Sequence, residues 1–276
     1  MKKAINFLKE FTYRPRMSNF IWKLHLANIS RKIYFYLNKP TNGIISLTVG
    51  GVSSDFHVYT PWELRALEPS GKIGNEKHIL ELLISKVNAG DIVYDVGSNL
   101  GVFSILLAKK VGTKGVVVAF EPETQTFSHL QDNIKLNNFN NVKAFNLALA
   151  ECDKDAELYL GQVTGACSLV KQADGGHGFQ KVKVRKGDSF VTKEKLPLPN
   201  LVKIDVEGAE YDVIKGLQET LSESACKFVC CEVHTQALPS GKRPDDIFNL
   251  LKSLGFNKIE KYERGTDEFH ILAQKL

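Results

Sequence analysis

The chain has 276 residues, of which 43% are apolar and 24% charged, with 21 Gly and 9 Pro. The length suits one catalytic-sized domain with an appendage, and the composition excludes collagen-like, low-complexity and wholly disordered proteins. The net charge of +5 arises from residues 1–40, where nine Lys or Arg accompany a single acid. Because a nucleic-acid-binding domain carries basic surface on its folded body, we expect no nucleic-acid partner.

The five cysteines show no C-x-x-C spacing, which favours reduced thiols and a cytoplasmic location over a disulfide framework or a zinc ribbon. The sequence has no uncharged apolar run of the ~20 residues that a membrane-spanning helix needs. Residues 1–40 mix aromatic and aliphatic side chains with their bases. This mixture is typical of a helix packed on the core, and also of a segment that lies on an anionic membrane surface. Both interpretations stay open, so peripheral membrane contact is one expectation.

The first predicted elements form a hairpin and a helix. Residues 44–49 and 52–60 flank Gly50-Gly51, a pair that supplies the positive φ of a tight turn. An amphipathic helix pattern follows over 79–86. We therefore expect a helical and hairpin extension over residues 1–60 and a catalytic domain over residues 61–276.

Strands and helices then alternate. Continuous apolar runs of strand length lie at 91–96, 115–120, 142–147, 201–206 and 228–233. The intervening helix patterns lie over 100–111, over a stretch opened by Glu121-Pro122, and over 213–217. Continuous rather than alternating apolar strands, separated by helices, predict an α/β fold with five parallel strands covered on both faces.

The end of the chain departs from this alternation. After a helix at 244–254, two strands at 256–262 and 269–275 are joined by too few residues for a helical crossover, so we expect them to pair antiparallel. A parallel sheet completed by such a hairpin resembles the Rossmann-like class I fold of S-adenosylmethionine-dependent methyltransferases. Between the third and fourth strands lies a long excursion, 148–200, with strand-like pieces around a Gly-rich loop at 173–178. Its length predicts a functional segment that covers a substrate.

The run D-V-G-S-N-L-G at 95–101 follows the first of these strands, where open α/β sheets bind ligands. Its spacing is not G-x-G-x-x-G. The Asp95 carboxylate would repel a pyrophosphate and suit the ammonium end of a cationic, phosphate-free cofactor such as S-adenosylmethionine. The alternative is a turn in which Asp95 and Asn99 cap the next helix.

Acids also follow the next strands. Glu121 stands where an acid accepts the hydroxyls of an adenosine ribose, although it would also suit a helix start. The run K-I-D-V-E-G-A-E at 203–210 follows the fourth strand and C-E-V-H the fifth. Strand alternation places Lys203 beside Asp205, and Glu232 on the same face as His234.

In this order, D-V-G-S-N-L-G, F-E-P-E, N-L-A-L-A, V-K-I-D-V-E-G-A-E and C-E-V-H resemble the FkbM family of methyltransferases over roughly 91–254. The resemblance implies S-adenosylmethionine as cofactor and transfer of its methyl group to a hydroxyl of a sugar, glycan or natural-product-like acceptor. The residues implied to bind the cofactor are Asp95, Gly97, Ser98, Asn99, Gly101, Glu121, Pro122, Asn146, Ala148 and Asp205.

Three residues are candidates for catalysis. A hydroxyl becomes a good nucleophile when a base accepts its proton, and His234 is the first candidate, followed by Asp205, with Glu232 nearby. The alternative is a histidine that is merely hydrogen-bonded at a strand end. A metal site formed by Asp205, Glu232 and His234 is an alternative, but no single element shows metal-ligand spacing, so we expect no metal. Two other functions stay open, an NAD-dependent oxidoreductase and a non-catalytic membrane-associated protein that retains the fold.

Overall fold

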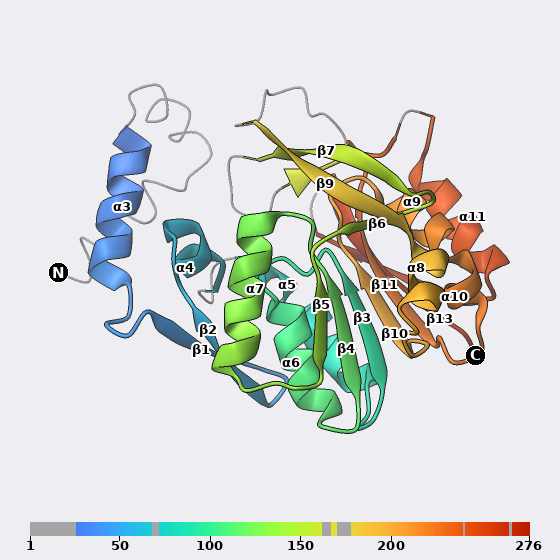
Figure 1. The fold of residues 1–276 in the computed structure, drawn as a ribbon, viewed down its shortest axis with the longest axis horizontal. Helices are drawn as coiled ribbons and strands as arrows, with labels where there is room; N and C mark the ends of the chain where they lie inside the picture. Colours follow the sequence, from blue (N-terminus) through green and yellow to red (C-terminus); the bar gives the residue numbers. More distant parts are fainter. Residues whose placement is uncertain (1–25, 68–71, 162–166, 170–177, 240, 265–266) are drawn as a thin grey trace. The chain divides into compact units, whose positions relative to one another are not determined.

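The computed structural model describes residues 26–67, 72–161, 167–169, 178–239, 241–264 and 267–276 (Figure 1). By their internal contacts these residues divide into two units, Met1–Leu47 with Asp55–Glu76, and Thr48–Ser54 with Lys77–Leu276. The contacts place 61–76 with the smaller unit, whereas the expected boundary follows residue 60. The boundary between functional domains stays a prediction.

A seven-stranded sheet forms the centre of the larger unit, with the order β12-β13-β11-β10-β3-β4-β5. Its strands are β3 (Ile92–Val96), β4 (Val116–Phe120), β5 (Val142–Phe145), β10 (Leu201–Ile204), β11 (Phe228–His234), β12 (Lys258–Glu263) and β13 (Glu268–Gln274). The five strands from β11 to β5 pair parallel. Every residue of β10 is buried, as expected for a strand covered on both faces.

The two C-terminal strands confirm the expected hairpin and add a detail of direction. β13 pairs antiparallel with both β11 and β12. It is therefore the single reversed strand of this sheet, and β12 at the edge runs in the same direction as the other five. This arrangement is the expected class I methyltransferase fold.

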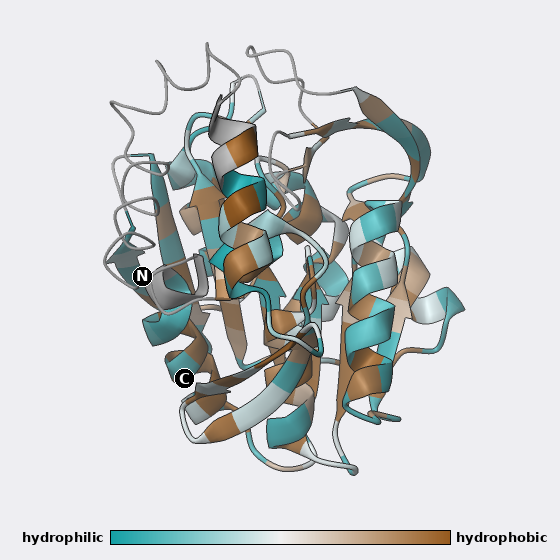
Figure 2. Cartoon of the chain, turned by 90° about the vertical axis from the view of Figure 1, so that its left-hand side faces the viewer, coloured by the Kyte–Doolittle hydropathy of each residue, from teal (hydrophilic) through white to brown (hydrophobic). Residues whose placement is uncertain are grey.

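Helices cover both faces of the sheet. α6 (Val102–Val111) and α7 (Thr124–Leu136) lie on one face, whereas α9 (Glu210–Gly216) and α11 (Pro244–Ser253) lie on the other (Figure 1). The short helices α8 (Gly187–Lys193) and α10 (Gln218–Ser222) accompany α9. Figure 2 shows hydrophobic colour concentrated along the central strands and hydrophilic outer faces on the helices. Because β3, β4, β10 and β11 run parallel, their carboxyl ends lie at one edge of the sheet.

The excursion after β5 forms a second sheet, with the order β6-β9-β7-β8. Its strands are β6 (Ala148–Ala150), β7 (Lys154–Leu160), β8 (Cys167–Ser168) and β9 (Phe179–Lys186). Both expected strand-like pieces are confirmed as β7 and β9. Of the expected Gly-rich loop at 173–178, all but Gly178 lies outside the described residues.

The N-terminal elements are α3 (Leu26–Asn38), β1 (Ile44–Val49), β2 (Val52–His57), α4 (Pro61–Leu67) and α5 (Lys72–Lys86). β1 and β2 form the expected two-stranded sheet. One side of α3 exposes large apolar side chains at helical spacing: Ile29, Ile33, Tyr36 and Leu37. Across the residues that the structure describes, no helix combines the length and apolar character needed to cross a membrane.

Candidate active site

A cavity opens at the carboxyl edge of the central sheet, where β3, β4 and β10 end. Its polar lining includes Asn99, Glu121, Asp205 and Glu207. Among the described residues that line it, every charged one is an acid. Such a lining favours a positively charged ligand and opposes a pyrophosphate.

Gly97 allows two strand ends to approach each other at the cavity wall. Its φ is +79°, and a Cβ atom built there would lie 1.8 Å from the carbonyl oxygen of Asp205. No side chain fits this position. The next turn continues with Asn99 at φ +51°, an unusual conformation that asparagine tolerates better than most residues. The Asn99 amide consequently faces the end of β4.

Glu121 presents a buried carboxylate to the cavity. Its Oε2 accepts from the backbone N–H of Asn99 and its Oε1 from that of Glu123, both at 2.9 Å. Burial raises the pKa of Glu121 to about 7, although these two hydrogen bonds favour the charged form. A carboxylate with so little solvation gains from further donors, and two ribose hydroxyls would supply them.

The helix after β4 begins later than the sequence indicated. We expected Glu121-Pro122 to open it, but α7 starts at Thr124, and the carboxylate of Glu123 caps the N–H groups of Gln125 and Thr126. Since Glu123 caps the helix, the carboxylate of Glu121 is not needed for that role. The alternative interpretation of Glu121 as a helix-start acid is therefore wrong.

Apolar side chains line much of the rest of the cavity. Leu147, Leu149 and Leu158 line it, together with Ala148 and Pro122. The flat, apolar face of an adenine ring suits such a slot. Asn146, which the family resemblance implied to bind the cofactor, donates to the carbonyls of Glu121 and Pro122 at 2.8 and 3.0 Å, and is not among the lining residues. It braces the loop that carries Glu121.

The structure corrects the expected role of the Asp95 charge. The side chain is fully buried and does not line the cavity. Ser104 donates to its Oδ2 at 2.6 Å, and its Oδ1 lies 3.3 Å from the ammonium of Lys203. Lys203 also lies 3.5 Å from Asp205 and donates to the Gly97 carbonyl. Asp95 and Lys203 therefore hold the strand ends together, and Asp95 is not placed to meet an ammonium group in the cavity.

Two further residues of the run at 95–101, Ser98 and Gly101, stabilise the turn. The Ser98 hydroxyl donates to the carbonyls of Asp95 and Phe120. Gly101 precedes α6 with φ +86°, where a Cβ atom would lie 2.4 Å from Leu130. Neither residue lines the cavity. Their binding of a cofactor stays a prediction, whereas their contribution to the turn is direct.

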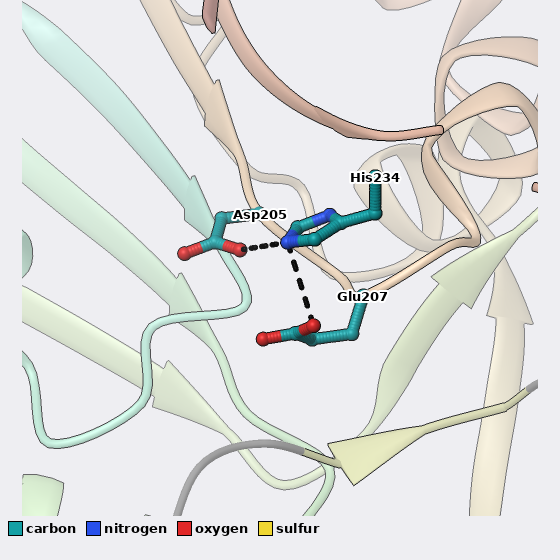
Figure 3. A group of neighbouring side chains, drawn as sticks. All are labelled: Asp205, Glu207 and His234. Carbon is teal, nitrogen blue, oxygen red and sulfur yellow. Dashed lines mark ion pairs between the residues drawn. The ribbon is translucent and has the colours of Figure 1, made fainter. Parts of the chain in front are cut away.

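A second group of side chains lies beside the cavity, at the ends of β10 and β11. His234 ends β11, and its Nδ1 lies 2.7 Å from Oε1 of the buried Glu210. Its Nε2 faces Glu207 at 3.4 Å and Asp205 at 4.0 Å (Figure 3). The structure thus brings all three catalytic candidates together, since Glu232 lies 3.9 Å from the same nitrogen, and adds two glutamates.

This environment changes the protonation of His234. Burial disfavours the charged ring, but the hydrogen bond to Glu210 and the charges of Glu207 and Asp205 outweigh it and raise the pKa of His234 to about 9. A ring that holds a proton at neutral pH accepts no proton from a hydroxyl. The role of His234 as general base stays a prediction, and it requires that proton to be displaced.

Glu232, the third catalytic candidate, belongs to a buried ion network. Its carboxylate is paired with Arg264 and lies 3.4 Å from Nε2 of His270. It also approaches Nε2 of His234 at 3.9 Å. These cationic partners stabilise the charged carboxylate. Because Glu232 does not line the cavity, any catalytic role it has would be exerted through His234.

Sequence reasoning missed the contribution of Glu207 and Glu210. Glu207 precedes α9 with φ +53°, and of the two only Glu210 belongs to the helix. The sequence feature that could have predicted their role is the pair Glu207-Gly208, an acid followed by a glycine that permits a tight turn. Gly208 has φ +109°, and its N–H donates to Glu210. This turn directs both acids toward β11.

Comparison with known proteins decides the family. A family model described as "Methyltransferase FkbM domain" matches residues 95–258. The chain belongs to the FkbM methyltransferase family. It is accordingly an S-adenosylmethionine-dependent methyltransferase, and the cavity with its acidic lining fits a sulfonium cofactor.

Individual relatives of this FkbM protein include two named methyltransferases. Hexuronic acid methyltransferase AglP of Haloferax volcanii is 29% identical over 228 residues, which cover 79% of this chain and 84% of AglP. 2-O-methyltransferase NoeI of Sinorhizobium fredii is 22% identical over 216 residues, covering 72% and 85%. Among solved structures, a precorrin-6y C5,15-methyltransferase from Geobacter metallireducens aligns with a TM-score of 0.45 at 14% identity, covering 72% of this chain and 89% of that one.

Proposed function

We propose that this protein transfers a methyl group from S-adenosylmethionine to a hydroxyl oxygen of a sugar, most specifically of a hexuronic acid within a glycan. The family supplies the reaction type. The names of two relatives, a hexuronic acid methyltransferase and a 2-O-methyltransferase, support a sugar hydroxyl as acceptor. The single observation that carries the proposal is the acid-lined cavity beside the cluster of Asp205, Glu207 and His234.

When bound, S-adenosylmethionine supplies a methyl group on a positively charged sulfur. The residues that would hold it are Gly97 and Asn99 at the turn, Glu121 for the ribose, and Ala148 with Leu149 beside the adenine. Asp205 and Glu207 border the same cavity, and their charges favour a cationic ligand there. The chain contributes chiefly by holding donor and acceptor in line, which alone accelerates a bimolecular reaction greatly.

The same observations oppose the oxidoreductase alternative. A dinucleotide places its pyrophosphate at the first strand-to-helix turn, and here the described residues around that turn present Glu121, Asp205 and Glu207. Calorimetry with S-adenosylhomocysteine and with NAD, run in parallel, separates the two. We expect S-adenosylhomocysteine to bind and NAD not to bind; binding of NAD alone would overturn the assignment.

The acceptor is tested with methyl-labelled S-adenosylmethionine and a panel of saccharides that end in a hexuronic acid, with the matching neutral hexose saccharides as controls. A uronic acid offers both hydroxyls and a carboxylate, so the product is treated with mild alkali. Label that survives is a methyl ether, as we expect, whereas label released as methanol is a methyl ester. Transfer to neither saccharide series would contradict a sugar acceptor.

We also propose that residues 1–40 contact an anionic membrane surface. The exposed apolar face of α3, which includes Ile33 and Leu37, lies on a helix that also carries the exposed Lys32, and such helices bind anionic interfaces. Co-sedimentation with vesicles that contain phosphatidylserine tests this. The variant Ile33→Ser/Leu37→Ser should pellet less than the unmodified protein, and equal pelleting would dismiss the contact.

A further inference from the structure

We propose that Asp205, Glu207 and His234 bind one divalent metal ion at the edge of the cofactor cavity. The sequence indicated no metal, because no single element shows ligand spacing. The structure assembles the ligands from two elements instead, the turn after β10 and the last residue of β11. Spacing along one helix or strand could not have revealed this set.

The distances between the three groups suit a shared ion. One carboxylate oxygen of Asp205, one of Glu207 and Nε2 of His234 all lie within 4.8 Å of one another. Nε2 lies 3.4 Å from Glu207 and 4.0 Å from Asp205 (Figure 3). Ligand atoms that each bind a metal at about 2.1 Å are themselves about 3 to 4 Å apart. The Glu207 side chain retains 22% exposure, so it has room to adjust to an ion.

The orientation of the imidazole is a second and independent indication. Glu210 is fully buried, and its Oε1 lies 2.7 Å from Nδ1 of His234. Its Oε2 has no hydrogen-bond partner within the described part of the chain. A histidine that binds a metal through one ring nitrogen regularly donates the other N–H to a carboxylate, which fixes its tautomer and raises its basicity. Glu210 therefore aims Nε2 at the place where Asp205 and Glu207 converge.

Carboxylates gather around this ring in unusual number. Four of them have an oxygen within 4.0 Å of a ring nitrogen of His234, those of Asp205, Glu207, Glu210 and Glu232. Taking carboxylates out of water is costly unless positive charge accompanies them. A dication supplies two positive charges at the point where these groups meet.

A second grouping, Glu232 with His234 and Glu268, is also compact enough to hold a metal. We assign the ion to the first because Glu232 and Glu268 both face the guanidinium of Arg264. Asp205 and Glu207, in contrast, line the cavity. An ion held by them is accessible to an acceptor. Lys203 lies beside one of its ligands, Asp205, whereas Arg264 pairs with two ligands of the second grouping.

The ligand chemistry indicates which ion binds. Two carboxylates and one imidazole suit a first-row divalent ion such as Mn²⁺, since carboxylates favour Mg²⁺ and Mn²⁺ while imidazole favours the transition metals. Ca²⁺, which takes oxygen ligands, suits this set less. The expected order of affinity is therefore Mn²⁺ above Mg²⁺ and Ca²⁺.

The metal deepens the proposed function, and this step rests on it. An ion held by Asp205, Glu207 and His234 would lower the pKa of an acceptor hydroxyl beside it, so that the hydroxyl would lose its proton to solvent. Its oxygen then forms a bond to the methyl carbon while the carbon–sulfur bond breaks, and the electron pair of that bond stays on sulfur. With the ion in place, His234 acts as a ligand through Nε2 rather than as the base.

The test uses the full-length protein after treatment with a chelator, and follows binding of Mn²⁺ by the loss of the free-ion signal in electron paramagnetic resonance. We expect one ion per chain. Glu207→Gln and Asp205→Asn should each weaken binding by about tenfold or more, in the range known for ligand and outer-shell losses. Glu268→Gln is the matched control, because it removes a carboxylate of the second grouping, and its Mn²⁺ affinity should equal that of the unmodified protein.

Thermal unfolding and S-adenosylhomocysteine binding show whether each variant is folded, and Glu207→Gln is the safest since its side chain is partly exposed. A folded protein that binds S-adenosylhomocysteine but no Mn²⁺ would overturn the metal site and leave the methyltransferase assignment intact. Loss of Mn²⁺ in Glu268→Gln with retention in Glu207→Gln would also overturn it. Mn²⁺ binding without methyl transfer to any saccharide would contradict the proposed acceptor only.

Discussion

The two halves of the cavity edge are built in different ways. At the end of β3 and β4, the backbone shapes the site: Gly97 permits a close approach of strands, and the N–H groups of Asn99 and Glu123 hold Glu121. At the end of β10 and β11, side chains from separate elements hold one another through charge, with His234 at the centre. Backbone geometry follows from a local motif, whereas a network of charges depends on every member. The two halves should therefore respond differently to substitution.

The largest effect is expected where the backbone half is most crowded. Gly97→Ala forces a Cβ atom against the carbonyl of Asp205 at a positive φ, so we expect a loss of about 3 kcal/mol or more in the free energy of unfolding. S-adenosylhomocysteine binding should be lost with it. Urea unfolding and calorimetry measure both.

Gly112→Ala is the matched control for Gly97→Ala. Gly112 has a similar φ of +69°, but a Cβ atom there would have no neighbour within 4 Å. Only the conformational cost should remain, about 1 to 3 kcal/mol because a ψ of −174° at this φ is almost confined to glycine. Equal losses in the two variants would show that the approach of Gly97 to Asp205 is not what the site requires.

The next largest effect concerns the ion pair that joins the two halves. Lys203→Met removes the ammonium beside Asp95 and Asp205, and a buried carboxylate that loses its cation is costly, by about 3 kcal/mol. Lys203→Met/Asp95→Asn should recover part of that loss in urea unfolding. If the double variant were no more stable than Lys203→Met, the pairing of Lys203 with Asp95 would be secondary.

This ion pair also shows how far the sequence could be read. The order of strands, the terminal hairpin and the positions of Gly97 and Glu121 follow from apolar runs and contiguous motifs, because β3 and β4 each lead directly into their turn. The role of Asp95 does not, because its charge is neutralised by Lys203, which lies more than a hundred residues later in the chain. The acidic character of the cavity was correctly expected, but Glu121, Asp205 and Glu207 supply it.

The properties of the charge-based half could not be predicted from the sequence either, because its charged groups also come from distant parts of the chain. His234 was expected to titrate near its usual pKa, and its neighbours from two other elements change that value. His234→Ala should lower turnover by about a hundredfold while S-adenosylhomocysteine affinity stays unchanged, since the ring is not among the residues that line the cavity. Steady-state kinetics and calorimetry give the two values. Turnover equal to that of the unmodified protein would remove His234 from the reaction.

Glu121 provides the corresponding test in the backbone half. There, in contrast to His234, the substitution should weaken cofactor affinity. Glu121→Ala removes the carboxylate that the ribose hydroxyls would meet, so cofactor affinity should weaken by about 1 to 3 kcal/mol. Glu157→Ala, on the exposed face of β7, serves as the control. An unchanged dissociation constant for Glu121→Ala would refute its assignment to the ribose.

The smallest expected effect is a pH dependence that only Glu121 should confer. Its pKa is raised to about 7, chiefly by burial, so below pH 7 the carboxyl holds a proton and offers fewer acceptor sites to ribose hydroxyls. Binding of those hydroxyls favours the charged form and hence lowers the pKa in the complex. S-adenosylhomocysteine affinity should therefore rise severalfold between pH 6 and pH 8, and Glu121→Gln should abolish this rise. Calorimetry at both pH values tests this, and a rise that persists in Glu121→Gln would show that another group confers the pH dependence.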